Sequence, residues 1–310
     1  MASLEDLRIF AAVCEVGSLS GVARAESCTQ SAVSQHVKRL EREFDIALIE
    51  RGRSGVSPTT AGKVLYQAAI DSLGTLATAR RRLTELRDGE AGALRITTGG
   101  TTLRHFMVEA LAQVRATHPG IAVEFRSATS TADCLEELHA DRADLAFVTL
   151  GTPPPGLQQR PVVRSRWVLV VTDDDPLAQR PAIGARHLRQ IRYVAMPSSS
   201  RSRQMLEAQL ADRGIQLTPI TTVDDWDTAI RLVEVGLGHA LVPALWVHDL
   251  GRHPHLRCVP VTPADTVIFG WVARRWDSLN RLAVTFVAEV QRQLRELRSA
   301  EGIEILSGQT

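Results

Sequence analysis

Cysteine is scarce in this chain of 310 residues. Its four cysteines are Cys14, Cys28, Cys134 and Cys258, and no two of them stand at the close, paired spacing of a zinc site or a small disulfide framework. We therefore expect four reduced thiols, no metal site and no resident cofactor.

Long apolar runs are also lacking. The sequence after Met1 has no charged, apolar, small-residue leader, and no uninterrupted apolar run approaches the roughly 20 residues that a bilayer-spanning helix needs. Both absences argue against secretion and against membrane insertion. They favour a cytoplasmic protein.

Neither sign of charge is in excess. Lys and Arg total 36 and Asp and Glu total 35, which gives a formal net charge of +1. A role in nucleic-acid binding must therefore rest on local arrangement and not on bulk charge. Hydrophobic residues at 44% and charged residues at 23% are ordinary for a globular protein, and the length favours two or three domains.

The first 61 residues predict short helices. The apolar spacing in "LEDLRIFAAVCEVG" indicates one helix that stops at Gly17, and Ser18 caps a second, "LSGVARAES". Thr29 caps a third that runs to about Phe44, and "ALIERGRSGVSPTT" then reads as a small β-hairpin or wing. A helix, a short turn and a second helix form the arrangement that presents the second helix to the DNA major groove.

A long helix is predicted from Thr59 until the glycines at Gly89 and Gly92. Its apolar residues recur at threes and fours in a narrow stripe, which is typical of a helix that pairs with a partner chain. The alternative is a single helix packed on its own domain. The residues that we expect in a dimer interface are Leu73, Leu76, Leu83 and Leu86.

Strand and helix patterns alternate after Gly92. Strands "ALRITTG", "IAVEFRSAT" and "DLAFVTL" are separated by helical segments, which predicts a parallel sheet with helices on its faces. The alternation of strands and helices continues beyond "TPPPG", and a final amphipathic helix spans about Asp277 to Arg298. Two α/β lobes are the economical interpretation, with ligands bound in a cleft at the strand carboxyl ends.

The order of these parts resembles that of LysR-type transcriptional regulators over essentially the whole chain. The resemblance is carried by "DLRIFAAVCEVGSLSGVARAESCTQSAVSQHVKRLEREFDIALIERG", "SPTTAG", "GALRITTG", "HPGIAVEF", "ADLAFV" and "VEVGLGHALVP". It implies an N-terminal all-α winged helix-turn-helix over 1–60, a linker and dimerisation helix over 61–91, and an α/β effector domain over 92–310 that is similar to periplasmic solute-binding proteins. Its first lobe would cover about 92–163 and 268–310, and its second about 164–267.

The resemblance also implies partners. These are double-stranded promoter DNA, further copies of the same chain in a dimer or tetramer, a small-molecule co-inducer or co-repressor, and RNA polymerase. One departure from the family pattern lies at Glu26, where an apolar residue is common. We expect Cys28 to supply a neighbouring apolar contact in its place.

The start of the third helix carries the expected DNA contacts. Unpaired N–H groups at a helix N-terminus suit a phosphate oxygen, and short polar side chains there can approach base edges. The candidates are Thr29, Gln30, Ser31, Ser34, Gln35, Lys38 and Arg39, together with Arg53 at the wing. Thr29 is better explained as an N-cap. Arg42 is equally well explained as a partner of neighbouring acids or solvent and as a phosphate contact, and Arg53 is nearly as well explained as a solvated hairpin tip.

The expected effector contacts are polar groups near the ends of strands and the starts of helices. They are Thr101, Thr102, Ser130, Thr149, Ser200 and Asp225. Such sites suit a small polar ligand, above all a carboxylate. Asp225 most simply caps the next helix; if it faces the cleft, it disfavours an anion there and favours an amine or hydroxyl.

An enzyme is not expected, because no nucleophile with its base and no set of metal ligands stands at a recognised spacing. "HPH" at His253 to His255 is better explained as a surface loop than as a metal site, and Cys134 as a buried apolar residue than as a redox sensor. The alternative function is a cytoplasmic α/β solute-binding or enzymatic protein whose N-terminal helices serve only assembly.

Overall fold

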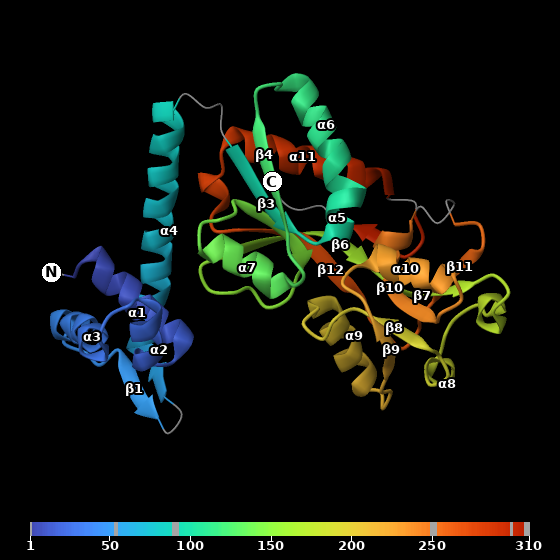
Figure 1. The fold of residues 1–310 in the computed structure, drawn as a ribbon, viewed down its shortest axis with the longest axis horizontal. Helices are drawn as coiled ribbons and strands as arrows, with labels where there is room; N and C mark the ends of the chain where they lie inside the picture. The colour runs from blue at the N-terminus through green and yellow to red at the C-terminus, as the bar shows by residue number, and fades with distance from the viewer. Residues whose placement is uncertain (1, 53–54, 89–92, 249–252, 298–299, 307–310) are drawn as a thin grey trace. The chain divides into compact units, whose positions relative to one another are not determined.

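A computed structural model describes residues 2–52, 55–88, 93–248, 253–297 and 300–306. The chain divides into two compact units, one built mainly from residues 1–89 and the other from nearly all of the remainder. Figure 1 shows the ribbon of both units, each of which is described below by itself. No helix in these ranges is both long enough and apolar enough to cross a membrane.

The N-terminal unit is a winged helix-turn-helix followed by a long helix. Its elements are α1 (Leu4–Val16), α2 (Leu19–Ala25), α3 (Gln30–Phe44), the antiparallel pair β1 (Ile49–Gly52) and β2 (Gly55–Pro58), and α4 (Thr60–Asp88). The core between the first three helices consists of buried apolar residues such as Phe10, Val22, Val33 and Leu40.

Local caps define these helices. The Ser18 and Thr29 hydroxyls accept hydrogen bonds from backbone N–H groups in the first turns of α2 and α3, as the sequence predicts. Gly17 ends α1 with a left-handed φ of 66°, a conformation that glycine adopts without strain. At the start of α4, a Cβ on Gly62 would lie 2.0 Å from the Leu48 carbonyl oxygen, so only glycine allows this close approach.

The leucine stripe of α4 differs in exposure along its length. Leu73 and Leu76 are partly exposed, and Leu83 is 66% exposed. The side chain of Leu86 lies outside the described residues. An apolar side chain as exposed as Leu83 on a helix is consistent with a partner surface, which the dimerisation hypothesis requires.

The second unit contains two sheets. The first lobe has the strand order β13-β6-β12-β5-β3-β4. Its strands are β3 (Ala93–Thr98), β4 (Ala122–Ser127), β5 (Leu145–Thr149), β6 (Gln158–Ser165), β12 (Val267–Ala273) and β13 (Ile303–Ile305). β3 pairs in parallel with β4 and β5, as the alternating pattern predicts, whereas β12 runs antiparallel to both β5 and β6.

The second lobe has the strand order β11-β7-β10-β8-β9. Its strands are β7 (Trp167–Thr172), β8 (Tyr193–Ala195), β9 (Pro219–Thr222), β10 (His239–Pro243) and β11 (Leu256–Pro260). The chain enters this lobe after β6 and leaves it after β11, so each lobe contains strands that pair in antiparallel fashion. A purely parallel sheet is therefore a wrong description of either lobe.

Helices cover both faces of the first lobe. They are α5 (Gly100–Thr102), the π-helical turn η1 (Leu103–Met107), α6 (Val108–Thr117), α7 (Thr131–His139) and α11 (Arg281–Glu296). Leu145 and Phe147 of β5 belong to the same core cluster as Phe286 of α11, while Ala146 and Val148 pack with Leu138 of α7. This alternation of side chains along one strand produces a three-layer lobe.

The second lobe carries α8 (Ala185–Leu188), α9 (Arg201–Ala211) and α10 (Trp226–Glu234). Figure 1 shows α9 and α10 beside the second sheet. The start of α9 and the start of α10 both lie at the pocket described below. One expected long helix in the first lobe is in fact interrupted, because the segment from Gly100 to Thr117 contains the wider π-helical turn.

Candidate functional site

The exposed face of α3 carries most of the predicted DNA contacts. The exposed members are Thr29, Gln30, Ser31, Gln35, Lys38 and Arg39, and Ser34 is half-buried. Thr29 also caps the helix, because its Oγ1 accepts a hydrogen bond of 3.2 Å from the Ala32 N–H. Arg53 lies outside the described residues.

A buried carboxylate holds α3 against α1. Asp6 is fully buried, and its Oδ2 accepts hydrogen bonds from the Ser3 N–H at 2.8 Å and from the Ser3 hydroxyl at 2.7 Å. Its Oδ1 lies 2.7 Å from His36 Nδ1 and 3.1 Å from Arg39 Nη1, both on α3. Burial raises the pKa of Asp6, but the hydrogen bonds from Ser3 and His36 and the charge of Arg39 outweigh it, so the pKa lies below its usual value.

The family departure at Glu26 is accommodated by an ion pair. Both Glu26 oxygens accept hydrogen bonds from Arg8, at 2.7 and 2.8 Å, and the same guanidinium also pairs with Glu5. The expectation that Cys28 replaces the missing apolar contact is wrong, because Cys28 is exposed. A surface network, and not an apolar contact, surrounds position 26.

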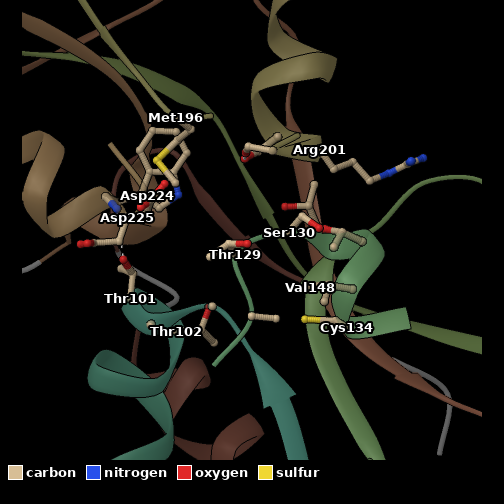
Figure 2. A pocket seen from close by; sticks show the side chains of 18 of the residues that line it. Thr101, Thr102, Thr129, Ser130, Cys134, Val148, Met196, Arg201, Asp224 and Asp225 are labelled. Atoms are coloured by element: carbon tan, nitrogen blue, oxygen red, sulfur yellow. Dashed lines mark hydrogen bonds between the residues drawn. The ribbon is translucent and has the colours of Figure 1, made fainter. Parts of the chain in front are cut away.

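A pocket lies between the lobes of the second unit, and Figure 2 shows it from close by. Together with its open mouth it encloses about 600 Å³ of empty space. All six of the residues predicted as effector contacts line it: Thr101, Thr102, Ser130, Thr149, Ser200 and Asp225. They come from both lobes and from five different elements or helix caps, which the topology brings to one place.

Helix caps orient the hydroxyls of this pocket. Ser130 Oγ accepts a hydrogen bond from the Asp133 N–H at 3.1 Å, and Thr101 Oγ1 accepts one from the Trp226 N–H at 3.2 Å. A hydroxyl that already accepts from a backbone N–H keeps its own proton to donate. These two side chains can therefore donate hydrogen bonds to a ligand.

Two further threonines are available to a ligand. Thr102 is 6% exposed and Thr149 is 8% exposed, yet no hydrogen bond within the described ranges engages either hydroxyl. Figure 2 shows the Thr102 side chain pointing into the pocket from α5. A nearly buried hydroxyl without a partner favours a ligand or water that supplies one.

Charged groups stand at two sides of the pocket. Arg201, at the start of α9, has no carboxylate partner in the part of the chain that the structure describes, and its guanidinium packs against Gly151. Asp224 is exposed on the opposite side (Figure 2). The sequence offers no local signal for Arg201, whose place at the pocket depends on the packing of the two lobes.

Asp225 has both of the roles considered for it from the sequence. It caps α10, since its Oδ1 accepts from the Thr228 N–H at 3.0 Å, and it also lines the pocket. The same oxygen lies 3.0 Å from Arg104 Nη2 of the first lobe. Because Arg104 balances its charge, Asp225 does not exclude an anion from the pocket.

Arg104 and His105 were not predicted as functional residues. Both lie in η1 of the first lobe, and both contact Asp227 of α10 in the second: Arg104 Nε lies 2.7 Å and His105 Nε2 2.9 Å from its oxygens. Together with Asp225 they form an interlobe cluster, defined here as Arg104, His105, Asp225 and Asp227. It joins the lobes immediately beside the pocket.

Aromatic rings form the apolar part of the interlobe contact. The Trp246 ring of the second lobe lies 5.7 Å from the Phe106 ring and 5.2 Å from the Phe269 ring, both in the first lobe. Trp246 and Phe269 also line the pocket. The lining of the pocket therefore combines apolar rings with hydrogen-bond donors, the usual composition of a small-molecule site.

Cys134 lies at the pocket and is buried. It is 2% exposed, and burial raises its pKa to about 11. A thiol of raised pKa is a poor nucleophile at neutral pH, which agrees with the structural interpretation of this residue. Of the predicted metal candidates, His253 pairs with Glu234 and His255 with Asp173, and the described residues contain no cluster suited to a metal ion.

Comparison with known families agrees with both units. Residues 4–63 match the bacterial regulatory helix-turn-helix of the lysR family, and residues 87–295 match the LysR substrate binding domain. The chain belongs to the LysR family. It is a DNA-binding transcriptional regulator with an effector-binding domain, and the alternative in which the N-terminal helices serve only assembly is set aside.

Curated relatives of this LysR-family regulator cover most of its length. It is 30% identical over 252 residues to the HTH-type transcriptional regulator CfxR of Cupriavidus necator, a match that spans 80% of this chain and 77% of that protein. It is 26% identical over 308 residues to BenM of Acinetobacter baylyi, spanning 96% and 97%.

Solved structures share the fold of this LysR-family regulator. Full-length BenM gives a TM-score of 0.57 at 24% identity, covering 97% of this chain and 99% of that one. CbnR complexed with its target DNA gives 0.52 at 21% identity, covering 94% and 99%. The match to a peroxide-bound cysteine mutant of Corynebacterium glutamicum OxyR has a TM-score of 0.59 at 23% identity, covering 96% and 94%.

Proposed function

We propose that the interlobe pocket binds the effector of this regulator, and that the effector is a small molecule rich in hydrogen-bond acceptors, such as a carboxylate. The observation that carries the proposal is the set of available donors in one pocket: Thr102 and Thr149, which have no hydrogen-bond partner among the described residues, and Thr101 and Ser130, whose protons are available. Ser200 and the charge-balanced Asp225 complete the proposed contacts.

Binding across the pocket would act as a switch. A ligand that contacts both lobes favours one relative arrangement of them, and it shifts the equilibrium only by its difference in affinity for the two arrangements. We propose that α4 passes this bias to the DNA-binding domains and so changes the geometry of the promoter complex. Co-inducer and co-repressor are both compatible with this scheme.

We assign DNA contact to α3, through Gln30, Ser31, Ser34, Gln35, Lys38 and Arg39, with Arg53 at the wing and Thr29 mainly as the cap. Polar side chains at the exposed start of a helix, followed by basic ones, suit base edges and phosphates respectively. Residues 1–60 would thus form the DNA-binding domain, 61–91 the linker and 92–310 the effector domain. Because promoter DNA is the target, the cytoplasm is the proposed place of action.

We also propose self-assembly through α4. The interface would contain Leu73, Leu76, Leu83 and Leu86, and a dimer or tetramer would then bind a pseudo-palindromic site. RNA polymerase is the partner through which such a complex would change transcription.

The effector proposal is tested with the purified full-length protein. A thermal-shift screen of metabolites identifies compounds that raise the melting temperature, because a ligand that binds only the native state stabilises it. The best compound is then titrated calorimetrically into wild type, Thr102→Val and Ser200→Ala. Thr221→Val is the matched control, since Thr221 is an exposed threonine on β9 outside the pocket lining.

We expect Thr102→Val to lower affinity roughly ten- to a hundredfold, because a hydrogen bond to a charged group contributes about 1.5–3 kcal/mol. DNA binding without the ligand should stay nearly intact. Equal ligand affinity in wild type, Thr102→Val and Ser200→Ala would show that the effector binds elsewhere. Joint loss of stability and DNA binding in Thr102→Val would show that the threonine only supports the fold.

A further inference from the structure

The contact between Asp6 and Arg39 connects the buried interior of the N-terminal unit to its exposed surface. The Asp6 carboxylate is fully buried, whereas the Arg39 side chain is 45% exposed. One guanidinium nitrogen, Nη1, faces Asp6 at 3.1 Å. Within the described ranges no hydrogen bond engages Nε or Nη2 of Arg39, so these donors remain available on the outer face of α3.

Asp6 is itself held rigidly. Its other oxygen accepts two hydrogen bonds from Ser3 in the capping box of α1, and His36 lies against the oxygen that faces Arg39. A carboxylate with this many donors has one available orientation. It can therefore hold the otherwise flexible arginine side chain in one geometry.

The remaining face of Arg39 lies among the predicted DNA contacts. Lys38 is its neighbour, and Gln35 precedes it by one helical turn; both are exposed. An arginine ordered before binding loses less conformational entropy when it meets a phosphate or a guanine edge. By contrast, the Arg8–Glu26 pair of the same unit does not involve α3.

We propose that Asp6 is a positioning residue for DNA binding, which holds Arg39 by one nitrogen and directs its free nitrogens to the phosphate backbone. The inference rests on the proposed contact between α3 and DNA. In this arrangement Arg39 contacts the DNA, and Asp6 acts only through Arg39. If Asp6 instead neutralised Arg39 and kept it from DNA, removal of the Asp6 charge would strengthen DNA binding.

The test uses the full-length protein and a duplex selected by it from random-sequence DNA. Affinity is measured at several salt concentrations for wild type, Asp6→Asn, Arg39→Gln and the double variant. Glu26→Gln is the matched control, because it also converts a carboxylate into an amide in the same unit while its arginine partner lies on α1. Circular dichroism and thermal melts identify variants with an altered fold.

We expect Arg39→Gln to weaken binding roughly tenfold and to reduce the slope of log K against log salt by about 0.9, the value for one phosphate. Asp6→Asn should weaken binding roughly threefold, because it releases the arginine, and should have no further effect when Arg39 is already Gln. Glu26→Gln removes the same charge and should leave affinity unchanged or slightly raised.

Three outcomes would overturn the proposal. Tighter binding by Asp6→Asn would mean that Asp6 withholds Arg39 from DNA. Equal losses from Asp6→Asn in the presence and absence of Arg39 would mean that Asp6 only supports the fold. An unchanged salt slope in Arg39→Gln would mean that Arg39 touches no phosphate. If Gln35→Ala and Lys38→Ala also bind as wild type does, the assignment of α3 itself is wrong, which is a separate failure.

Discussion

His105 and Asp227 lie 122 residues apart in the sequence, yet His105 Nε2 is 2.9 Å from Asp227 Oδ1. The first belongs to η1 of one lobe and the second to α10 of the other. Arg104 contacts the same carboxylate. The two lobes are thus joined by hydrogen bonds and charge beside the pocket, in addition to their aromatic contacts.

The interlobe cluster makes a contribution to stability that depends on pH. Burial raises the pKa of Asp227, but the hydrogen bonds and charges of His105 and Arg104 lower it by more, so the pKa lies below its usual value. A carboxylate of lowered pKa stabilises the folded state above its unfolded pKa of about 4, and this contribution is lost as pH falls through the folded value. We expect Asp227→Asn to reduce the free energy of unfolding by up to about 1 kcal/mol at about pH 5, because the group is partly solvated.

Urea unfolding of wild type and Asp227→Asn at about pH 5 and about pH 3.5 checks this expectation. The difference between the two proteins should shrink at the lower pH. Asp265→Asn is the matched control, because Asp265 pairs with Arg213 inside the second lobe and both side chains are exposed. A difference that stays constant or grows at the lower pH would contradict the assigned contacts of Asp227.

The proposed DNA surface of α3 predicts distinct effects of two substitutions. Gln35→Ala should cost about 1–3 kcal/mol at a specific site if its amide reads a base edge, and little on unrelated DNA. Lys38→Ala should weaken all sequences by similar factors and reduce the salt slope by about 0.9. Competition between the selected duplex and random DNA at one salt concentration measures both. Uniform loss from Gln35→Ala would reassign it to phosphate contact.

The stripe of α4 predicts the assembly state. Leu76→Lys and Leu83→Lys should each shift the protein toward monomer, because a charge in a helix-to-helix interface loses its hydration without a partner. Gln67→Lys is the control, since Gln67 is exposed and lies on the opposite side of the same helix. Light scattering at several protein concentrations gives the mass. A parent-sized oligomer in both leucine variants, with folding intact, would exclude this interface.

The four cysteines should differ in reactivity. Cys28 is exposed, whereas burial raises the pKa of Cys134 and of Cys14 to about 11 and that of Cys258 to about 12. A thiol reagent at about pH 7.5 should modify Cys28 first, and Cys134 only when the protein unfolds. Cys28→Ser should abolish the fast phase. A fast phase that persists in this variant would show that another thiol is accessible.

Local sequence patterns were sufficient to predict the first three helices of the N-terminal unit. Ser18, Thr29 and Gly17 act within a few residues of their own position, so capping rules locate the first three helices closely. The contacts of Glu26 could not be predicted in this way. Its partner Arg8 lies 18 residues away on another helix, and the apolar contact expected from Cys28 is absent because that side chain is exposed.

Pocket residues were also partly predictable, for the same local reason. Ser130, Ser200 and Asp225 are helix caps, and caps at the ends of strands of an α/β lobe tend to lie at its cleft. Arg104 could not be found in this way. Its partners are 121 and 123 residues distant, and the π-helical turn that contains it leaves no distinct spacing in the sequence.

The interruption of the first sheet by the second lobe affects the order in which the chain can fold during synthesis. β5 is completely buried, but its neighbour β12 begins only at Val267, after every strand of the second lobe. The second lobe is contiguous from β7 to β11 and can close while β5, already paired with β3 on one side, still lacks its β12 neighbour on the other. Nascent or truncated chains that stop before β12 would therefore present the apolar edge of β5 to other molecules, which makes them prone to aggregation and suited to recognition by chaperones.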